Sequence, residues 1–239
     1  MYLDHDSKPG KTEVNRVIQT PECWLSWPIS VNGHPPSDDD KEKARKRLEG
    51  LINDPDSRNN NRKQIDEDAA KATALVKILP DAFLFTPAGR QDGFIKLTFK
   101  PNPDFKPSSH EAKVFHAMAG VLLINAKEKR LAKLSGKLTH DVDFGLGVLA
   151  KIHKGGTFSV VQSEVAPGDW ELTRLDVYIS GRAMFFHSIS EQQHEVKTGF
   201  REVPAKIELQ QASSMVQQAQ PQGSPKLAAN RSSRHQQSR

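Results

Sequence analysis

Gly145, Gly147 and Ala150 have the spacing of the G-x-G-x-x-A sequence that binds dinucleotides. That motif works only where a strand leads through the glycine turn into a helix whose N-terminus receives the pyrophosphate. Here Gly155 and Gly156 would end such a helix within a turn or two, and no β-α-β pattern surrounds the motif. We therefore expect no dinucleotide site, and no other pattern in the chain calls for a cofactor.

His140, Asp141 and Asp143 carry atoms that suit divalent metals. On an extended strand, however, the two carboxylates would point to one face and the imidazole to the other. The pair His110 and His116, six residues apart, does not share a helical face. We expect a solvated strand end at residues 140–143, and no metal site.

Nucleophilic catalysis finds little support. Cys23 is the only cysteine and lies in a proline-flanked, tryptophan-rich stretch without a nearby histidine. A G-x-S-x-G elbow, a P-loop, an H-E-x-x-H pattern and an EF-hand are all absent from the sequence. A single cysteine also excludes an internal disulfide and a cysteine-rich zinc site. We expect no catalytic residues and no enzymatic activity.

The positive charge of the chain is concentrated near its C-terminus. The formal net charge is +5, and residues 205–239 hold five Lys or Arg against one Glu, a net of +4, which leaves +1 for residues 1–204. The basic run at residues 41–47 follows Asp38, Asp39 and Asp40, so it reads as a solvated helix face. Aromatic residues for base stacking do not accompany the arginines of the tail. We expect no specific nucleic-acid binding.

Hydropathy limits where the protein can reside. Mean hydropathy is −0.61, and no apolar run approaches the roughly 18 residues of a membrane-spanning helix. Residues 1–10 are polar and acidic, without the apolar region of a signal peptide. Taken literally, the chain is cytoplasmic, although it could equally be a mature or truncated form of an exported precursor.

Two helices are predicted before a long series of strands. Residues 12–31 read as extended, Asn32-Gly33 as a turn, and Ser37 as the N-cap of a helix over 37–53. A polar linker at 57–62 precedes a second helix over 63–79. Residues 81–201 read as short strands joined by tight turns, interrupted by one helical turn near 108–117.

These elements predict an α+β fold: one large, curled antiparallel sheet, a half-barrel, with two helices on its concave side. We expect residues 1–204 to form this domain and the Gln-rich, basic segment 205–239 to be disordered, apart from a transient helix over 207–216. Two helices can cover only part of such a sheet, so an open apolar surface could remain beside the core.

Alternating apolar residues are the candidate lipid-binding groove. We expect one sheet face to carry all eight of them: Ile95, Leu97, Phe99, Val121, Leu123, Leu175, Val177 and Ile179. They can form a sealed core, or they can line a groove in which each buried CH₂ of an acyl chain contributes roughly 0.8 kcal/mol. The alternation alone does not separate these two readings.

The order of segments from Thr20 to Pro204, about three quarters of the chain, resembles the LolA-like and RseB-like outer-membrane lipoprotein-sorting superfamily. The resemblance is carried by ISVNGHPPSDDD (29–40), FIKLTFKPNPDF (94–105), residues 107–115, AGVLLINAKEKR (119–130), DFGLGVLAKIHKGG (143–156) and the turn at 168–170. It implies a half-barrel in the periplasm or cell envelope that binds lipid or lipoprotein acyl chains without catalysis.

The chain departs from that family in three respects. Relatives begin with a signal peptide and with an additional first strand, and residues 2–12 look like the end of the hairpin that this strand forms. The polar tail is also atypical of the family. Three functions stay open: a lipid carrier, a ligand-free structural or sensor module that binds an envelope protein through its sheet, and a non-functional truncated fragment.

Overall fold

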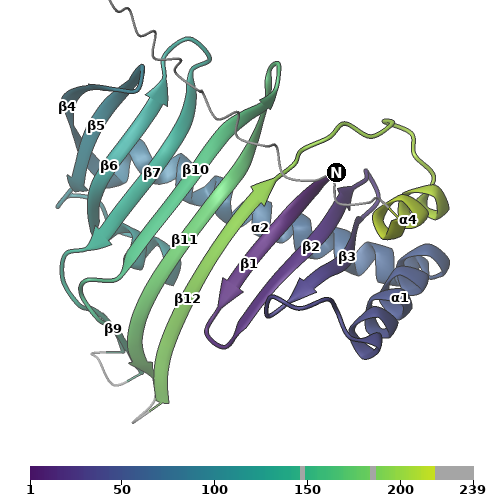
Figure 1. Cartoon of the computed structure of the whole chain (residues 1–239). Helices are drawn as coiled ribbons and strands as arrows, with labels where there is room; N and C mark the ends of the chain where they lie inside the picture. The colour runs from purple at the N-terminus through teal and green to yellow at the C-terminus, as the bar shows by residue number, and fades with distance from the viewer. Residues whose placement is uncertain (146–148, 184–186, 219–239) are drawn as a thin grey trace, which may run out of the picture.

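The computed structural model describes residues 1–145, 149–183 and 187–218. In these residues the protein is α+β, with one open antiparallel sheet of 12 strands and four helices (Figure 1). The helices are α1 (Asp38–Asn53), α2 (Pro55–Ala82), α3 (His110–His116) and α4 (Leu209–Gln218). The predicted fold class, a curled antiparallel sheet combined with helices, is confirmed.

Ten strands form one continuous path, β3-β2-β1-β12-β11-β10-β7-β6-β5-β4, and the short β8 and β9 join it where β9 pairs with β11. The N-terminal hairpin therefore adds to the sheet beside the last strand, β12. The strands are β1 (Tyr2–Lys8), β2 (Lys11–Gln19), β3 (Trp24–Val31), β4 (Phe83–Gln91), β5 (Phe94–Pro101), β6 (Met118–Asn125), β7 (Arg130–Leu138), β8 (Val142–Phe144), β9 (Ala150–Ile152), β10 (Thr157–Ala166), β11 (Asp169–Ala183) and β12 (His187–Thr198).

Cross-strand pairing distinguishes the two faces of the sheet. One row across β5, β6, β7, β10 and β11 consists of Leu97, Leu122, Leu134, Val160 and Leu175. Residues directly opposite each other in an antiparallel ladder project from the same face. The end of α2 packs into the same core as this row, and α2 crosses behind the sheet in Figure 1. We call the face with this row the inner face, and the other the outer face.

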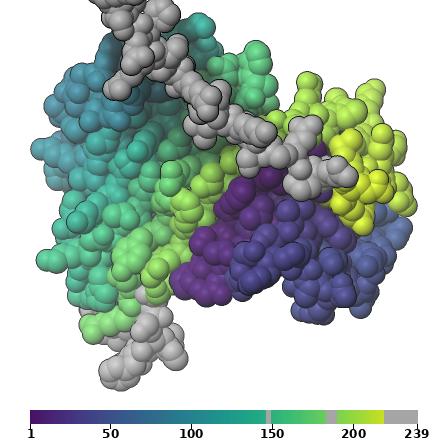
Figure 2. All heavy atoms as spheres, viewed as in Figure 1, coloured from purple at the N-terminus to yellow at the C-terminus, as the bar shows by residue number. Residues whose placement is uncertain are grey.

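Two separate hydrophobic cores stabilise the sheet at its two ends. Core 1 joins the inner face of β4–β7 to α3 and the end of α2; its buried residues include Leu79, Ala82, Phe83, Phe99, Phe115, Met118, Leu122, Leu134, Leu138, Val142 and Ile152. Core 2 joins β2 and β3 to α1 and α4, which lie together at the β3 end of the molecule (Figure 2). Its buried residues are Ile18, Cys23, Leu25, Leu48, Leu51, Ile207, Ala212 and Val216.

The helix starts follow local capping chemistry. Ser37 caps α1 and forms a reciprocal capping box with Asp40, as the sequence predicted. The linker predicted at 57–62 is wrong, because α2 already begins at Pro55. The Asp54 carboxylate accepts hydrogen bonds from the backbone N–H groups of Asp56 and Ser57, and proline is favoured in a first helical turn.

Part of the predicted disordered tail is folded. α4 buries Ala212 and Val216 completely in core 2, and the backbone C=O of Val216 accepts a 2.7 Å hydrogen bond from the buried Arg16 guanidinium. The domain therefore extends to at least residue 218, beyond the predicted boundary at 204. The reason is tertiary, since α4 covers apolar residues of β2 and β3 that would otherwise face water. Residues 219–239 lie outside the described residues.

The middle of α2 does not pack against the sheet. Residues 66–74 are all exposed although they cover every side of the helix, and Val76 is 51% exposed. A helix lying on a sheet buries the stripe of side chains that faces it. With 28 residues α2 is about 42 Å long, close to the roughly 43 Å width of ten paired strands. α2 therefore bridges the sheet between its two cores.

Candidate functional site

Six of the eight predicted groove residues share the inner face, and two do not. Pairing places Leu97 opposite Leu122, but Val121 opposite Thr98 and Leu123 opposite Lys96, on the outer face. The prediction that all eight line one face is therefore wrong for Val121 and Leu123. Within the apolar run of β6, alternation alone gave no way to choose which residues point inward.

The six inner residues differ in their packing. Phe99 is 4% exposed within core 1, and Leu97 and Ile179 pack against that core. Leu175 and Val177 are only partly buried and belong to neither core. Ile95 is also partly buried, near the start of β5. The strongest candidates for ligand contact are therefore the β11 residues under the bridging helix.

These β11 residues form an apolar track that leads to a pocket. Leu175, Val177 and Ile179 project from the inner face in succession, and Gly181 follows, paired with Ile152 of β9. The side chain of Ile152 lies against Gly181, where an added Cβ would be 3.2 Å from its Cδ1. At about 3.4 Å per residue, the track from Leu175 to Gly181 is about 20 Å long.

The pocket at the end of this track lies between α3 and the β8–β9 hairpin. Its volume is about 430 Å³, and its lining is mainly apolar: His110, Glu111, Val114, Phe144, Gly145, Leu149, Ala150 and Ile152. The His110 ring packs edge-on to Phe144 at 4.9 Å between centroids, and the Lys113 ammonium lies 5.2 Å from the centre of the same ring. Leu149 is 59% exposed, so an apolar ligand could cover it.

Charged residues occupy the inner face beyond β11. The row that contains Leu175 continues with Glu195 of β12, Asp6 of β1 and Glu13 of β2. Glu195 forms a 3.1 Å ion pair with Lys197, in which both side chains are about 15% exposed. Sequence reasoning missed this row, although the alternation of acidic residues at the start of β1 could have indicated it.

Asp4 is the most perturbed carboxyl of this charged region. Burial is the main reason that its pKa is raised, to about 6, and the negative charge of Glu195 raises it further, whereas Lys197 opposes the shift. One oxygen of Asp4 and one of Asp6 are buried without a hydrogen-bond partner in the described part of the chain. The inner face is thus apolar on β11 and acidic on β12 and β1.

The predicted strand end at 140–143 is occupied by a cation of the protein itself. The Lys151 ammonium lies 3.6 Å from an Asp141 oxygen and 3.2 Å from an Asp143 oxygen, while His140 contacts Thr139. Within residues 1–145, 149–183 and 187–218, no three His, Cys, Asp or Glu side chains gather as metal ligands would. The dinucleotide-like motif includes residues 146–148, which lie outside the described residues.

Cys23 is fully buried in core 2, and burial raises the pKa of its thiol. A buried thiol with a raised pKa is a poor nucleophile.

No helix in the described ranges combines the length and apolar character needed to cross a bilayer. Comparison of the chain with family models, curated proteins and solved structures finds no match.

Proposed function

We propose that the protein binds the acyl chain of a lipid or of a lipidated protein along the inner face of β11, beneath α2. One observation carries this proposal: Leu175 and Val177 are apolar and partly exposed on the inner face, yet they pack into neither core. The helix that passes over them leaves residues 66–74 exposed. An apolar chain placed there would cover Leu175 and Val177 and displace water from them.

The dimensions and the energetics support an acyl ligand. The track of about 20 Å ends beside the mainly apolar pocket of about 430 Å³ at Ile152. Each CH₂ removed from water contributes roughly 0.8 kcal/mol, so ten buried methylenes contribute roughly 8 kcal/mol before ordering costs. The acidic residues on β12 and β1 favour a chain that lies on β11 rather than farther across the sheet. The proposal includes no catalytic step. The resemblance to lipoprotein-sorting proteins would place such a carrier in the cell envelope.

Mass spectrometry of an organic extract of the purified protein, compared with a matched blank, tests the proposal. We expect stoichiometric phospholipid or fatty acid, and saturable binding of a fluorescent fatty acid after delipidation. Val177→Glu places a carboxylate on the track and should reduce probe affinity at least tenfold. Thr98→Glu, on the exposed outer face of β5, is the matched control and should bind as the wild type does.

A clean extract together with no probe binding by the folded protein would refute the acyl-ligand proposal. That result would favour the second candidate, a module that binds another protein by strand addition. β4 supports this alternative, because it ends the sheet path and its outer edge pairs with no other described strand. Leu84 on this strand is 44% exposed, although Pro87 limits the backbone N–H groups available for pairing.

A further inference from the structure

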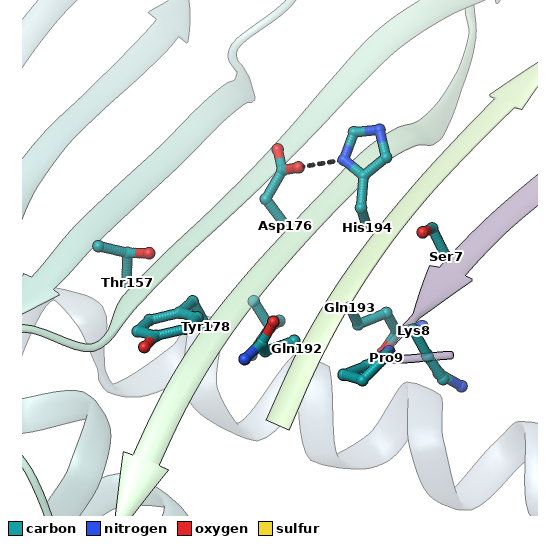
Figure 3. Close-up of a pocket in the computed structure, with 10 residues that line it drawn as sticks. Ser7, Lys8, Pro9, Thr157, Asp176, Tyr178, Gln192, Gln193 and His194 are labelled. Atoms are coloured by element: carbon teal, nitrogen blue, oxygen red, sulfur yellow. Dashed lines mark hydrogen bonds and ion pairs between the residues drawn. The ribbon is translucent and has the colours of Figure 1, made fainter. Parts of the chain in front are cut away.

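A pocket of about 460 Å³ lies on the outer face of the sheet, on the opposite side of β11 from the apolar track (Figure 3). Two rows of side chains line it. One row crosses β11, β12 and β1 with Asp176, His194 and Ser7, and the other crosses β10, β11 and β12 with Thr157, Tyr178 and Gln192. Strand pairing therefore holds six polar side chains in a fixed array on one surface.

The charges in this pocket are already paired. The Asp176 carboxylate contacts His194 Nδ1 at 2.5 Å through one oxygen and accepts a 3.0 Å hydrogen bond from Arg174 Nε through the other. The Lys8 ammonium, from the last residue of β1, also lines the pocket and forms a 3.1 Å ion pair with Asp6. A phosphate or carboxylate ligand would have to break one of these pairs, so the pocket is better matched to a neutral ligand.

The order Asp176, His194, Ser7 is that of a nucleophilic triad, but the surroundings do not fit one. No hydrogen bond joins Ser7 to His194 among the contacts of the described residues. The neighbouring backbone N–H groups belong to the regular ladders of β1, β11 and β12, so they cannot converge on a developing oxyanion. The array is therefore suited to binding rather than to acyl transfer.

Tyr178 gives the pocket an aromatic surface. It is 48% exposed, and its hydroxyl makes no hydrogen bond within the described ranges. Gln192 is paired directly with Tyr178 across the ladder, and its amide can both donate and accept hydrogen bonds, as can the hydroxyls of Thr157 and Ser7. An exposed aromatic ring beside uncharged donors and acceptors suits a ligand with one apolar face and many hydroxyl groups.

We propose that this outer pocket binds a neutral oligosaccharide, with one sugar ring stacked on Tyr178 beside Gln192 and Thr157, and with the hydroxyls of a neighbouring ring bonded by Ser7. A sugar ring presents C–H groups on its face and hydroxyls around its rim, which matches this arrangement. Asp176 and Arg174 act as positioning residues, because they fix the imidazole of His194 at the edge of the array. This inference does not depend on the acyl-chain proposal, since it uses the other face of the sheet.

Calorimetric titration of the full chain with maltotetraose, cellotetraose and chitotetraose, each up to about 10 mM, tests this proposal. We expect saturable binding of at least one of the three. Tyr178→Ala should weaken it about tenfold, whereas Tyr178→Phe keeps the ring and should retain affinity within about threefold. Thr98→Ala, on the outer face of β5 and outside the pocket, should leave the affinity unchanged.

Absence of saturable binding by all three sugars to the folded protein would overturn the proposal. So would equal affinities of wild type and Tyr178→Ala, because binding would then occur elsewhere on the molecule. Tyr178 is about half exposed and belongs to neither core, so its replacement should not unfold the protein, and circular dichroism of each variant checks this. Lipid content of the same variants should match the wild type, which separates this site from the inner track.

Discussion

Replacing Asp4 with asparagine should stabilise the protein at neutral pH and have little effect at acidic pH. In the folded protein the pKa of this carboxyl is raised to about 6, mainly by burial and then by the charge of Glu195, against 3.8 for an ordinary aspartate. Asp6 adds repulsion from the same strand, Lys197 is the nearby cation that opposes the shift, and the residue opposite Asp4 on β2 is the uncharged Asn15.

The direction in which stability changes with pH follows from proton binding by Asp4 in the folded and unfolded states. Because the folded state holds the Asp4 proton more tightly than the unfolded state, stability rises as the pH falls from about 7 to about 4, and the unfavourable charge is fully present above pH 7. A difference of about two pKa units corresponds to about 3 kcal/mol without screening. Asp4 is partly exposed to water, so we expect about 1 kcal/mol. The amide that replaces the carboxyl in Asp4→Asn would also be able to donate a hydrogen bond to Glu195, as protonated Asp4 does.

Urea unfolding followed by tryptophan fluorescence, at pH 7.5 and pH 4 in constant salt, measures the difference in unfolding free energy between wild type and Asp4→Asn. Asp4→Asn should raise the unfolding free energy by about 1 kcal/mol at pH 7.5 and by much less at pH 4. Asp68→Asn, on an exposed part of α2, is the control and should show no pH-dependent gain. A destabilised Asp4→Asn protein at pH 7.5, or equal gains at both pH values, would refute the reasoning.

Three further predictions test the packing. An added Cβ at Gly120 would lie 1.9 Å from the backbone oxygen of Ser135, so Gly120→Ala should lower the unfolding free energy by about 2 kcal/mol or more, and wild-type stability would contradict this. Val216→Asp buries a charge in core 2 and should cost about 3 kcal/mol or more in urea unfolding. Gln211→Asp, on the exposed side of α4 near its N-terminus, is the control and should not destabilise the protein. Equal stabilities of the two variants would show that α4 does not cover the core. The buried Cys23 thiol should react with a disulfide reagent only as urea unfolds the protein, and immediate reaction of the native protein would argue against this burial.

Local patterns in the chain were sufficient for the strand-rich body and the first helix. The alternation in residues 94–100 corresponds to β5, and the turn at Asn32-Gly33 follows β3, with both residues at positive φ. The Ser37 cap begins α1 one residue later. These features depend on side-chain periodicity and on hydrogen bonds within one turn, so neighbouring residues suffice to specify them.

The start of α2 and the folding of α4 were not predicted correctly for different reasons. The pattern predicts a polar linker at 57–62, whereas Pro55 follows the Asp54 cap in the first turn of α2, where proline is tolerated. α4 is a ten-residue helix that would be marginal alone, and its order comes from Ala212 and Val216 packing onto β2, β3 and α1. The start of α2 follows from a local capping rule, which neighbouring residues are enough to apply. The order of α4, in contrast, depends on packing against residues far away in the sequence.

The candidate sites show the same division. Alternation along β11 is visible in the chain without any structure, and it puts Leu175, Val177 and Ile179 on one face and Asp176 and Tyr178 on the other. The folded chain was needed to learn which face α2 crosses and that Val121 and Leu123 point outward. It was also needed to learn that His194 and Gln192 lie beside Asp176 and Tyr178. The physical reason is that alternation fixes relative orientation within a strand, whereas register between strands and the position of a bridging helix depend on contacts between residues far apart in the chain.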